Sequence, residues 1–352
     1  MVIDIKYEDA QKKDHFLIID VRSPSEFLDA TIPGAINIPL FDDQERAIVG
    51  TAYKEQGPDK AKEIGLQIVS PKIPQLIHKI KAALAGNKIP LFFCWRGGMR
   101  SKTMATLYDL MFQDAYRLEG GYRAYREYIL KQIDEFEIKI PTFVLHGMTG
   151  VGKTSILHKL EQMGVTVVDL EGLAGHRGSI FGGIGNVNPV NQKTFDSKIY
   201  EIFKQIKKAR AIVIEAESKR IGKILVPDNI LKAKENGYHI LINADINVRI
   251  ERIIEEYNPE KNKDSISEAI TKILKRIPTE HRESITSALE RDDFYTIVDI
   301  MLNYYYDPRY RHSTTQYQGA FYEVNSDDLN EATINIFNYI QQILNETEVL
   351  VK

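Results

Sequence analysis

The chain has 352 residues, too many for one typical domain, and its 43% hydrophobic and 27% charged residues are ordinary for a soluble protein. The net charge of −3 excludes a uniformly basic nucleic-acid-binding surface, so any such surface has to be a local patch. A single cysteine excludes an internal disulfide and a cysteine-cluster metal site, and the sequence shows no signal-type or membrane-spanning apolar run, which together indicate a cytoplasmic protein with no membrane partner.

Short apolar runs alternate with helical patterns in the first third of the chain, which predicts a parallel α/β sheet. The predicted elements are strands at 16–20, 35–40 and 89–94 and helices at 73–86, 101–113 and 120–136. A second series begins at residue 140, with later strands at 165–170, 211–216 and 238–244 and a charged helical pattern from about residue 247 onward. The predicted fold class is therefore α/β, with one domain at 1–138 and a second, ending in a helical part, at 139–352.

The only cysteine, Cys94, ends an apolar run at the point where parallel α/β sheets bind ligands. Glycines behind it allow backbone N–H groups to turn inward, and arginines and the start of a helix add positive potential. The predicted anion cradle for a chalcogen donor consists of Arg96, Gly97, Gly98, Met99, Arg100 and Ser101. Such surroundings favour thiolate, the nucleophilic form, whereas an inert buried cysteine, the alternative, has no need of an anion cradle.

Four segments, "IIDVRSPSEF", "IPGAINIPL", "CWRGGMRS" and "LEGGYRAYR", follow one another in an order that resembles a rhodanese domain. The resemblance implies a rhodanese-like fold and sulfur-group transfer, with Cys94 carrying a persulfide or its selenium analogue. Asp20 and Arg22 match a structural pair at a strand end and not catalytic residues.

"GMTGVGKT", residues 147–154, fits the phosphate-loop pattern G-x-x-x-x-G-K-[ST] between a predicted strand and a predicted helix. The predicted diphosphate-binding residues are Gly147, Gly150, Val151, Gly152, Lys153 and Thr154. The pattern specifies phosphate oxygens only, so ATP and an alkyl diphosphate both fit and the use of Mg²⁺ stays open. This predicts a P-loop NTPase-like second domain.

Several residues near the phosphate loop are candidates for a second set of contacts or for a substrate loop. They are Asp169, Glu171, His176, Arg177, Glu215 and Glu217. A nucleoside triphosphatase places a carboxylate on a later strand to hold Mg²⁺, but each of these acids can equally be a helix cap or a surface charge. From the sequence, none stands out.

The rhodanese pattern, the phosphate loop, "DLEGLAGHRGSIFG" and "EAESKRIG" together resemble the tRNA 2-selenouridine synthase family. The resemblance implies that 2-thiouridine at the wobble position of tRNA is S-geranylated with geranyl diphosphate. Selenium from selenophosphate then replaces the geranylthio group. It implies tRNA, through its anticodon loop, and a selenophosphate-supplying system as partners, and no tightly bound cofactor or metal.

Basic and aromatic residues offer candidate tRNA contacts, namely Lys219, Arg220, Arg309 and Arg311. Lysine-rich helices are equally typical of solvated faces, and the tyrosines around Arg309 can be core. Trp95 has two interpretations as well, a stacking face near the thiol or a filler of the domain interface. An alternative function is a rhodanese-type sulfurtransferase fused to an ATP-dependent kinase or NTPase.

Overall fold

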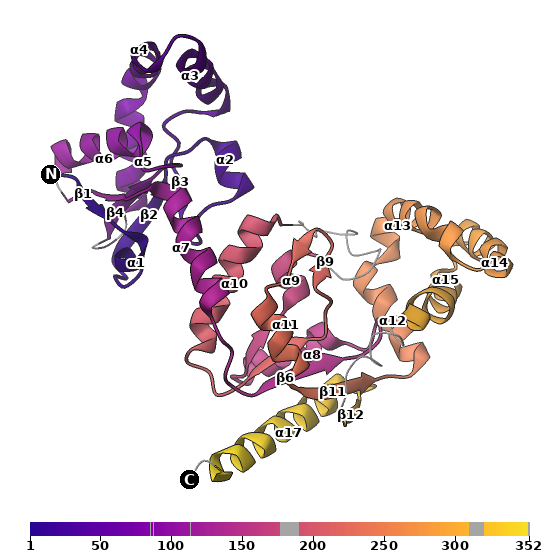
Figure 1. The fold of residues 1–352 in the computed structure, drawn as a ribbon. Coiled ribbons are helices and arrows are strands. Elements are labelled where there is room, and N and C mark those ends of the chain that lie inside the picture. Colours follow the sequence, from indigo (N-terminus) through magenta and orange to yellow (C-terminus); the bar gives the residue numbers. More distant parts are fainter. Residues whose placement is uncertain (85, 87, 113, 177–189, 310–319, 351–352) are drawn as a thin grey trace. The chain divides into compact units, whose positions relative to one another are not determined.

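The computed structural model (Figure 1) describes residues 1–84, 86, 88–112, 114–176, 190–309 and 320–350. It divides into two compact units, Met1–Glu135 with Asp196–Tyr200, and Phe136–Phe195 with Glu201–Lys352. The main break, after Glu135, lies shortly before residue 139, where the second domain is predicted to start. No helix in the described ranges is long and apolar enough to cross a bilayer.

The first unit is built on a five-stranded sheet in which every neighbouring pair is parallel. In spatial order its strands are β1 (Ile3–Ile5), β5 (Tyr116–Leu118), β4 (Ile89–Phe93), β2 (Phe16–Asp20) and β3 (Ile36–Asn37). The helices are α1 (Tyr7–Ala10), α2 (Pro24–Asp29), α3 (Asp43–Glu55), α4 (Pro58–Val69), η1 (Ser70–Lys72), α5 (Ile73–Ala83), α6 (Met99–Phe112) and α7 (Gly121–Glu135). The predicted α/β class with a parallel sheet is confirmed.

The helical hairpin α3–α4 has no counterpart among the predicted elements. Its sequence nevertheless carries a start signal, because Asp42 accepts a hydrogen bond from the backbone N–H of Glu45 while the Glu45 side chain bonds the backbone N–H of Asp42. This reciprocal arrangement satisfies two N–H groups that a helix leaves without partners. The hairpin lines a cavity together with α6.

The second unit contains another five-stranded parallel sheet with the phosphate-loop strand at its centre. In spatial order its strands are β12 (Tyr322–Asn325), β11 (Tyr238–Asn243), β6 (Thr142–His146), β8 (Ile212–Glu215) and β7 (Thr166–Val168). A small antiparallel hairpin joins β9 (Arg220–Ile221) to β10 (Ile224–Leu225). The associated helices are α8 (Lys153–Gln162), α9 (Leu170–Ala174), α10 (Gln192–Ile206), α11 (Asp228–Glu235) and α17 (Leu329–Leu350).

The described residues from 246 to 306 form a series of helices, as the charged helical pattern from about residue 247 predicts. These helices are α12 (Ile246–Tyr257), α13 (Pro259–Ile273), η3 (Leu274–Arg276), α14 (Thr279–Glu290), α15 (Phe294–Met301) and η4 (Leu302–Tyr306). The chain then returns to the sheet as β12, which pairs with β11, so the C-terminal part also contributes one strand, Tyr322–Asn325, that is not among the predicted elements. A strand of four residues is too short for its period to show in the sequence.

Candidate functional site

The thiol of Cys94 lies just beyond the carboxyl end of β4, where the strand passes into a tight loop. Only 3% of the residue is exposed. Its Sγ accepts a hydrogen bond from the backbone N–H of Gly98 at 3.2 Å, and Ser101 Oγ lies 3.2 Å away. Helix α6 begins at Met99, so its positive end adjoins the sulfur. This geometry stabilises a negative charge on a chalcogen atom.

Glycines hold the cysteine loop against the turn before α7. Gly97 and Gly121 both have positive φ, 62° and 61°. A Cβ atom on Gly121 would lie 2.3 Å from the carbonyl oxygen of Cys94 and 2.4 Å from the nitrogen of Gly97, so no larger residue fits. Tyr122 then donates its backbone N–H to the Cys94 carbonyl at 2.9 Å. The segment "LEGGYRAYR" therefore fixes the shape of the thiol loop.

The arginines near the loop have different surroundings. Arg96 is exposed. Arg100 instead binds Glu26 through both guanidinium nitrogens, so its charge is already engaged by a carboxylate. Burial raises the pKa of Glu26, but its bonds with Arg100 outweigh this and leave the pKa below its ordinary value. A role of Arg100 in holding an anion beside the thiol stays a prediction.

Two further side chains make contacts at the loop, and the contacts of the first, Arg117, have no counterpart in the sequence-based prediction. Arg117 donates to the carbonyl oxygen of Gly97 at 3.1 Å and forms an ion pair with Asp4. Trp95 is 38% exposed, and its ring centroid lies 5.8 Å from that of Tyr122. Within its own unit Trp95 therefore presents part of its face beside the thiol loop.

Asp20 and Arg22 form a buried ion pair at the end of β2. Asp20 is 0% exposed and Arg22 is 2% exposed, and Arg22 Nη2 lies 2.6 Å from Asp20 Oδ2. Arg22 also donates to the carbonyl oxygen of Ala30 and lies over the ring of Tyr122, 4.3 Å from its centroid. The pair thus ties together the segments around the thiol, which is a structural role.

Replacing Asp20 with alanine should destabilise the first unit strongly, because Arg22 would remain buried without its partner. Breaking such a buried pair costs about 3–5 kcal/mol. Urea unfolding followed by circular dichroism measures the loss. Asp59→Ala removes a carboxylate from an exposed pair with Lys62 and serves as the control, expected to leave the midpoint unchanged. Equal midpoints for the two variants would contradict a structural role for the buried pair.

The phosphate loop joins β6 to α8, as its motif predicts. Gly150 has a φ of 83°, and a Cβ atom there would lie 2.9 Å from the carbonyl oxygen of Arg249. Val151 is buried, Gly152 precedes the helix in the left-handed conformation, and the exposed Thr154 lies in its first turn. The Lys153 ammonium donates to the carbonyl oxygen of Gly147 at 2.7 Å. The loop thus has the form that wraps phosphate oxygens at a helix N-terminus.

Two arginines of the helical part donate hydrogen bonds to backbone carbonyl groups of this loop. Arg249 Nε donates to the carbonyl oxygen of Thr149 at 2.9 Å, and its other nitrogens bind both Asp307 oxygens at 2.9 and 2.6 Å. Arg252 donates to the carbonyl oxygen of Val151 at 3.2 Å. Sequence reasoning missed these positioning contacts, since nothing in the spacing connects residues 249 and 307 with the loop.

The acidic candidates near the phosphate loop have different surroundings in the structure. Asp169 caps α9 by accepting a hydrogen bond from the N–H of Gly172 at 2.7 Å. Glu215 ends β8, the strand next to the phosphate-loop strand, and is 0% exposed. Its Oε2 accepts a weak bond from the Glu171 N–H at 3.3 Å, while its Oε1 is buried and has no hydrogen-bond partner among the residues that the structure describes.

Burial and neighbouring acidic groups raise the pKa of Glu171 and that of Glu215. Burial, and next the charge of Glu217, raise the pKa of Glu171 to about 8. Burial and the charge of Glu171 raise the pKa of Glu215 well above its ordinary range. Lys153 acts in the opposite direction on both. A buried acidic group beside a phosphate-loop lysine is a common setting for phosphate chemistry.

Glu171→Gln should stabilise the protein at alkaline pH. Folded Glu171 keeps its proton up to about pH 8, whereas an unfolded glutamate loses it near its ordinary pKa of 4.5. Wild-type stability contributed by this group is therefore complete below pH 4.5 and is lost as the pH rises through 8. Glutamine carries no such proton, so the variant should gain on the order of 1 kcal/mol over wild type at pH 8.5.

The measurement is urea unfolding at pH 5 and pH 8.5, with Glu161→Gln on the exposed side of α8 as the matched control. The stabilisation should appear only for Glu171→Gln and only at the higher pH. A pH-independent difference would show that Glu171 is not held protonated.

The remaining candidates that the structure describes lie in different parts of the second unit. His176 is half-buried and packs against Gly222 in the β9–β10 turn. Lys219 is exposed and paired with Asp228 at 3.0 Å, and Arg220 is exposed on β9. Arg309 lies over the ring of Tyr305, 3.7 Å from its centroid. Arg177 and Arg311 lie outside the described residues.

The tyrosines beside Arg309 divide between core and surface. Tyr305 and Tyr306 are buried in the core of the helical part, whereas Tyr304 is 45% exposed and stacks on His281 with a centroid distance of 3.7 Å. Of these side chains only Tyr304 is therefore placed to stack on a splayed base.

Within the described ranges, no three His, Cys, Asp or Glu side chains are grouped so as to hold a metal ion. Mg²⁺ at a phosphate loop is usually held by one or two protein oxygens together with substrate phosphates and water. Oε1 of Glu215, buried at the end of the strand beside the loop and without a partner in the described part of the chain, fits such a cation, and Thr154 offers a hydroxyl group.

Comparison with known proteins agrees with the arrangement of both units. The family model described as the tRNA 2-selenouridine synthase AAA domain matches residues 140–342, and that of the rhodanese-like domain matches residues 6–128. The chain is 32% identical to a tRNA 2-selenouridine synthase of Shewanella woodyi over 86% of its own length and 89% of that protein. For the Pseudomonas putida protein of the same name, the identity is 31% over 84% and 87%.

A third relative of that name, from Nitrosomonas europaea, is 33% identical over 68% of this chain and 63% of its own length. The matches cover the thiol loop, the phosphate loop and most of the helical part within one chain. The chain belongs to the tRNA 2-selenouridine synthase family.

Proposed function

We propose that this protein makes 2-selenouridine in tRNA in two steps, S-geranylation of 2-thiouridine at the wobble position followed by replacement of the geranylthio group with selenium. The observation that carries the proposal is the presence of a thiol in an anion-stabilising loop and a well-formed phosphate loop in one member of this family. Each loop suits one of the two steps.

In the first step the sulfur of 2-thiouridine attacks the first carbon of geranyl diphosphate. A C–S bond forms, the C–O bond breaks, and diphosphate leaves with the electron pair. The phosphate loop and Lys153 would stabilise the charge that develops on this leaving group. Mg²⁺ held by Thr154 and Glu215 would supply further charge neutralisation.

In the second step selenium at the oxidation level of selenide bonds to C2 of the base, the C2–S bond breaks, and geranylthiolate leaves. Water takes the phosphate of the selenophosphate donor, so the step needs no oxidant or reductant. Alkylation makes the sulfur a better leaving group than it is in 2-thiouridine. The loop around Cys94 would hold the anionic donor, with the thiol as the group that contacts selenium.

One observation favours a second candidate, an ATP-dependent kinase or NTPase joined to a sulfurtransferase. Glu215 lies where nucleoside triphosphatases place the carboxylate that holds Mg²⁺. Competition binding separates the two. If the proposed function is right, geranyl diphosphate should bind to the protein, either by displacing a bound fluorescent nucleotide or in the absence of nucleotide binding. Productive ATP binding with no affinity for geranyl diphosphate would favour the kinase.

The direct test is mass spectrometry of nucleosides from tRNA, with and without the gene, in cells supplied with selenium. We expect 2-selenouridine to disappear and 2-thiouridine to accumulate when the gene is deleted. Unchanged 2-selenouridine would refute the proposed function. Co-purification of RNA, seen as absorbance at 260 nm, would further distinguish a tRNA enzyme from a small-molecule kinase.

A further inference from the structure

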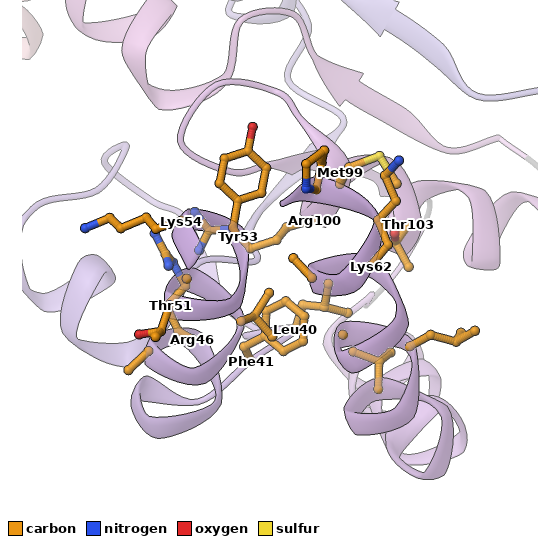
Figure 2. A pocket seen from close by; sticks show the side chains of 18 of the residues that line it. Leu40, Phe41, Arg46, Thr51, Tyr53, Lys54, Lys62, Met99, Arg100 and Thr103 are labelled. Carbon is orange, nitrogen blue, oxygen red and sulfur yellow. The ribbon is translucent and has the colours of Figure 1, made fainter. Parts of the chain in front are cut away.

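A large apolar cavity lies beside the thiol loop of the first unit (Figure 2). Its volume is about 880 Å³, within the range of about 300–1,000 Å³ typical of small-molecule sites. Helices α3, α4 and α6 form its walls, and Figure 2 shows Leu40 and Phe41 between the flanking helices. Gly65 faces Phe41 without a side chain of its own, which leaves the space open.

The cavity adjoins the site described above through one short segment. Met99 and Arg100 line the cavity, and the residues on either side of them, Gly98 and Ser101, both contact the Cys94 sulfur. A ligand in the cavity therefore lies next to the reacting thiol loop.

The opening combines exposed apolar side chains with positive charge. Tyr53, Leu66 and Met99 line the cavity yet are 61%, 66% and 59% exposed. Among the described residues that line the cavity, the charged side chains are all basic, and they are Arg46, Lys54, Lys62 and Arg100. Glu26 contacts Arg46 and Arg100, and Asp59 contacts Lys62, so Lys54 contributes the least compensated charge. An apolar chain joined to phosphate groups matches both properties.

We infer that this cavity binds the isoprenoid chain of the geranyl group while phosphate groups attached to the same molecule lie at its basic mouth. The inference rests on the proposed function. Its ligand chemistry has two sources, the geranylated tRNA intermediate, whose backbone carries the phosphates, and free geranyl diphosphate. Holding the chain here would place the C2–S bond of the intermediate beside the thiol loop.

The test uses the full-length protein and an anticodon stem–loop RNA containing either S-geranyl-2-thiouridine or 2-thiouridine. Fluorescence anisotropy should show at least about 10-fold tighter binding of the geranylated RNA by wild type, because the apolar chain becomes buried. Leu66→Glu places a carboxylate at the exposed mouth, and Val49→Trp fills the cavity from α3. Both variants should lose this preference.

Leu28→Glu is the matched control, since Leu28 is 81% exposed and lies on α2, outside the cavity lining. It should keep the wild-type preference. Circular dichroism checks folding, and Leu66→Glu, which changes an exposed residue, keeps the test decisive should Val49→Trp fail to fold. Wild-type preference in Leu66→Glu, with its fold intact, would overturn the inference.

A second arm separates the two sources by calorimetric titration with geranyl diphosphate alone. Binding that Leu66→Glu weakens and Lys153→Ala leaves unchanged would assign the cavity to the free donor. Binding that only Lys153→Ala weakens would assign it to the RNA-bound chain. Turnover separates a failure of the proposed function from a failure of the cavity inference. If wild type makes no 2-selenouridine from geranylated RNA, the proposed function fails. Normal turnover by wild type, with unchanged RNA binding by the cavity variants, defeats the cavity inference alone.

Discussion

Replacing Cys94 with serine should abolish the formation of 2-selenouridine while the protein stays folded. The two side chains are similar in size, so the packing cost should stay below about 1.5 kcal/mol. A serine hydroxyl is a far weaker nucleophile than a thiolate and does not offer a soft atom to selenium. No other cysteine in the chain can take over, because Cys94 is the only one. The measurement is mass spectrometry of nucleosides after incubation with 2-thiouridine RNA, geranyl diphosphate and selenophosphate.

The same reaction contains its own control. In the proposed mechanism, geranylation depends on the phosphate loop and not on the thiol, so Cys94→Ser should still convert 2-thiouridine into its S-geranyl form and then stop. An accumulated S-geranyl product also shows that the variant is folded and binds RNA. Normal selenouridine formation by Cys94→Ser would show that the thiol does not take part in selenium transfer.

The parts of the fold that the sequence predicted are those whose signal is local. Strand β2 coincides with the predicted residues 16–20, and α5, α6 and α7 begin within two residues of their predictions, because buried apolar runs and helical spacing extend over enough residues to be distinct. Strand β12 could not be recognised, since a run of four residues is too short to show a period and its place in the sheet depends on pairing with the distant β11.

The candidate site shows the same division. The thiol loop and the phosphate loop each lie within ten consecutive residues, so their chemistry can be read from the chain. Contacts between residues far apart in the sequence cannot be predicted in this way. The pairing of Arg100 with Glu26 and the contact of Arg249 with Thr149 depend on how the chain folds back. The pKa shifts of Glu171 and Glu215 likewise depend on burial and on mutual proximity.

If alkylation precedes selenium transfer, as proposed, Lys153→Ala should block the first step and spare the second. Lys153→Ala removes the ammonium group that lies within the phosphate loop and leaves the thiol loop in the other unit unchanged. Loss of one electrostatic stabiliser of a leaving group typically slows a reaction about 10²–10³-fold. The variant should therefore leave 2-thiouridine unmodified and form little 2-selenouridine. When it is supplied with RNA that already carries the geranyl group, selenium transfer should return to the wild-type rate.

Two comparisons make this result decisive. Lys159→Ala changes a lysine of the same helix that binds Asn330 at the surface, and it should behave as wild type on both RNAs. Cys94→Ala should show the reverse pattern and stall at the S-geranyl stage whichever RNA it receives. Quantifying 2-thiouridine, its S-geranyl form and 2-selenouridine for the three variants separates the steps. If Lys153→Ala fails equally on geranylated RNA, the phosphate loop must also act in selenium transfer or in holding the RNA, because a defect confined to alkylation would have been bypassed.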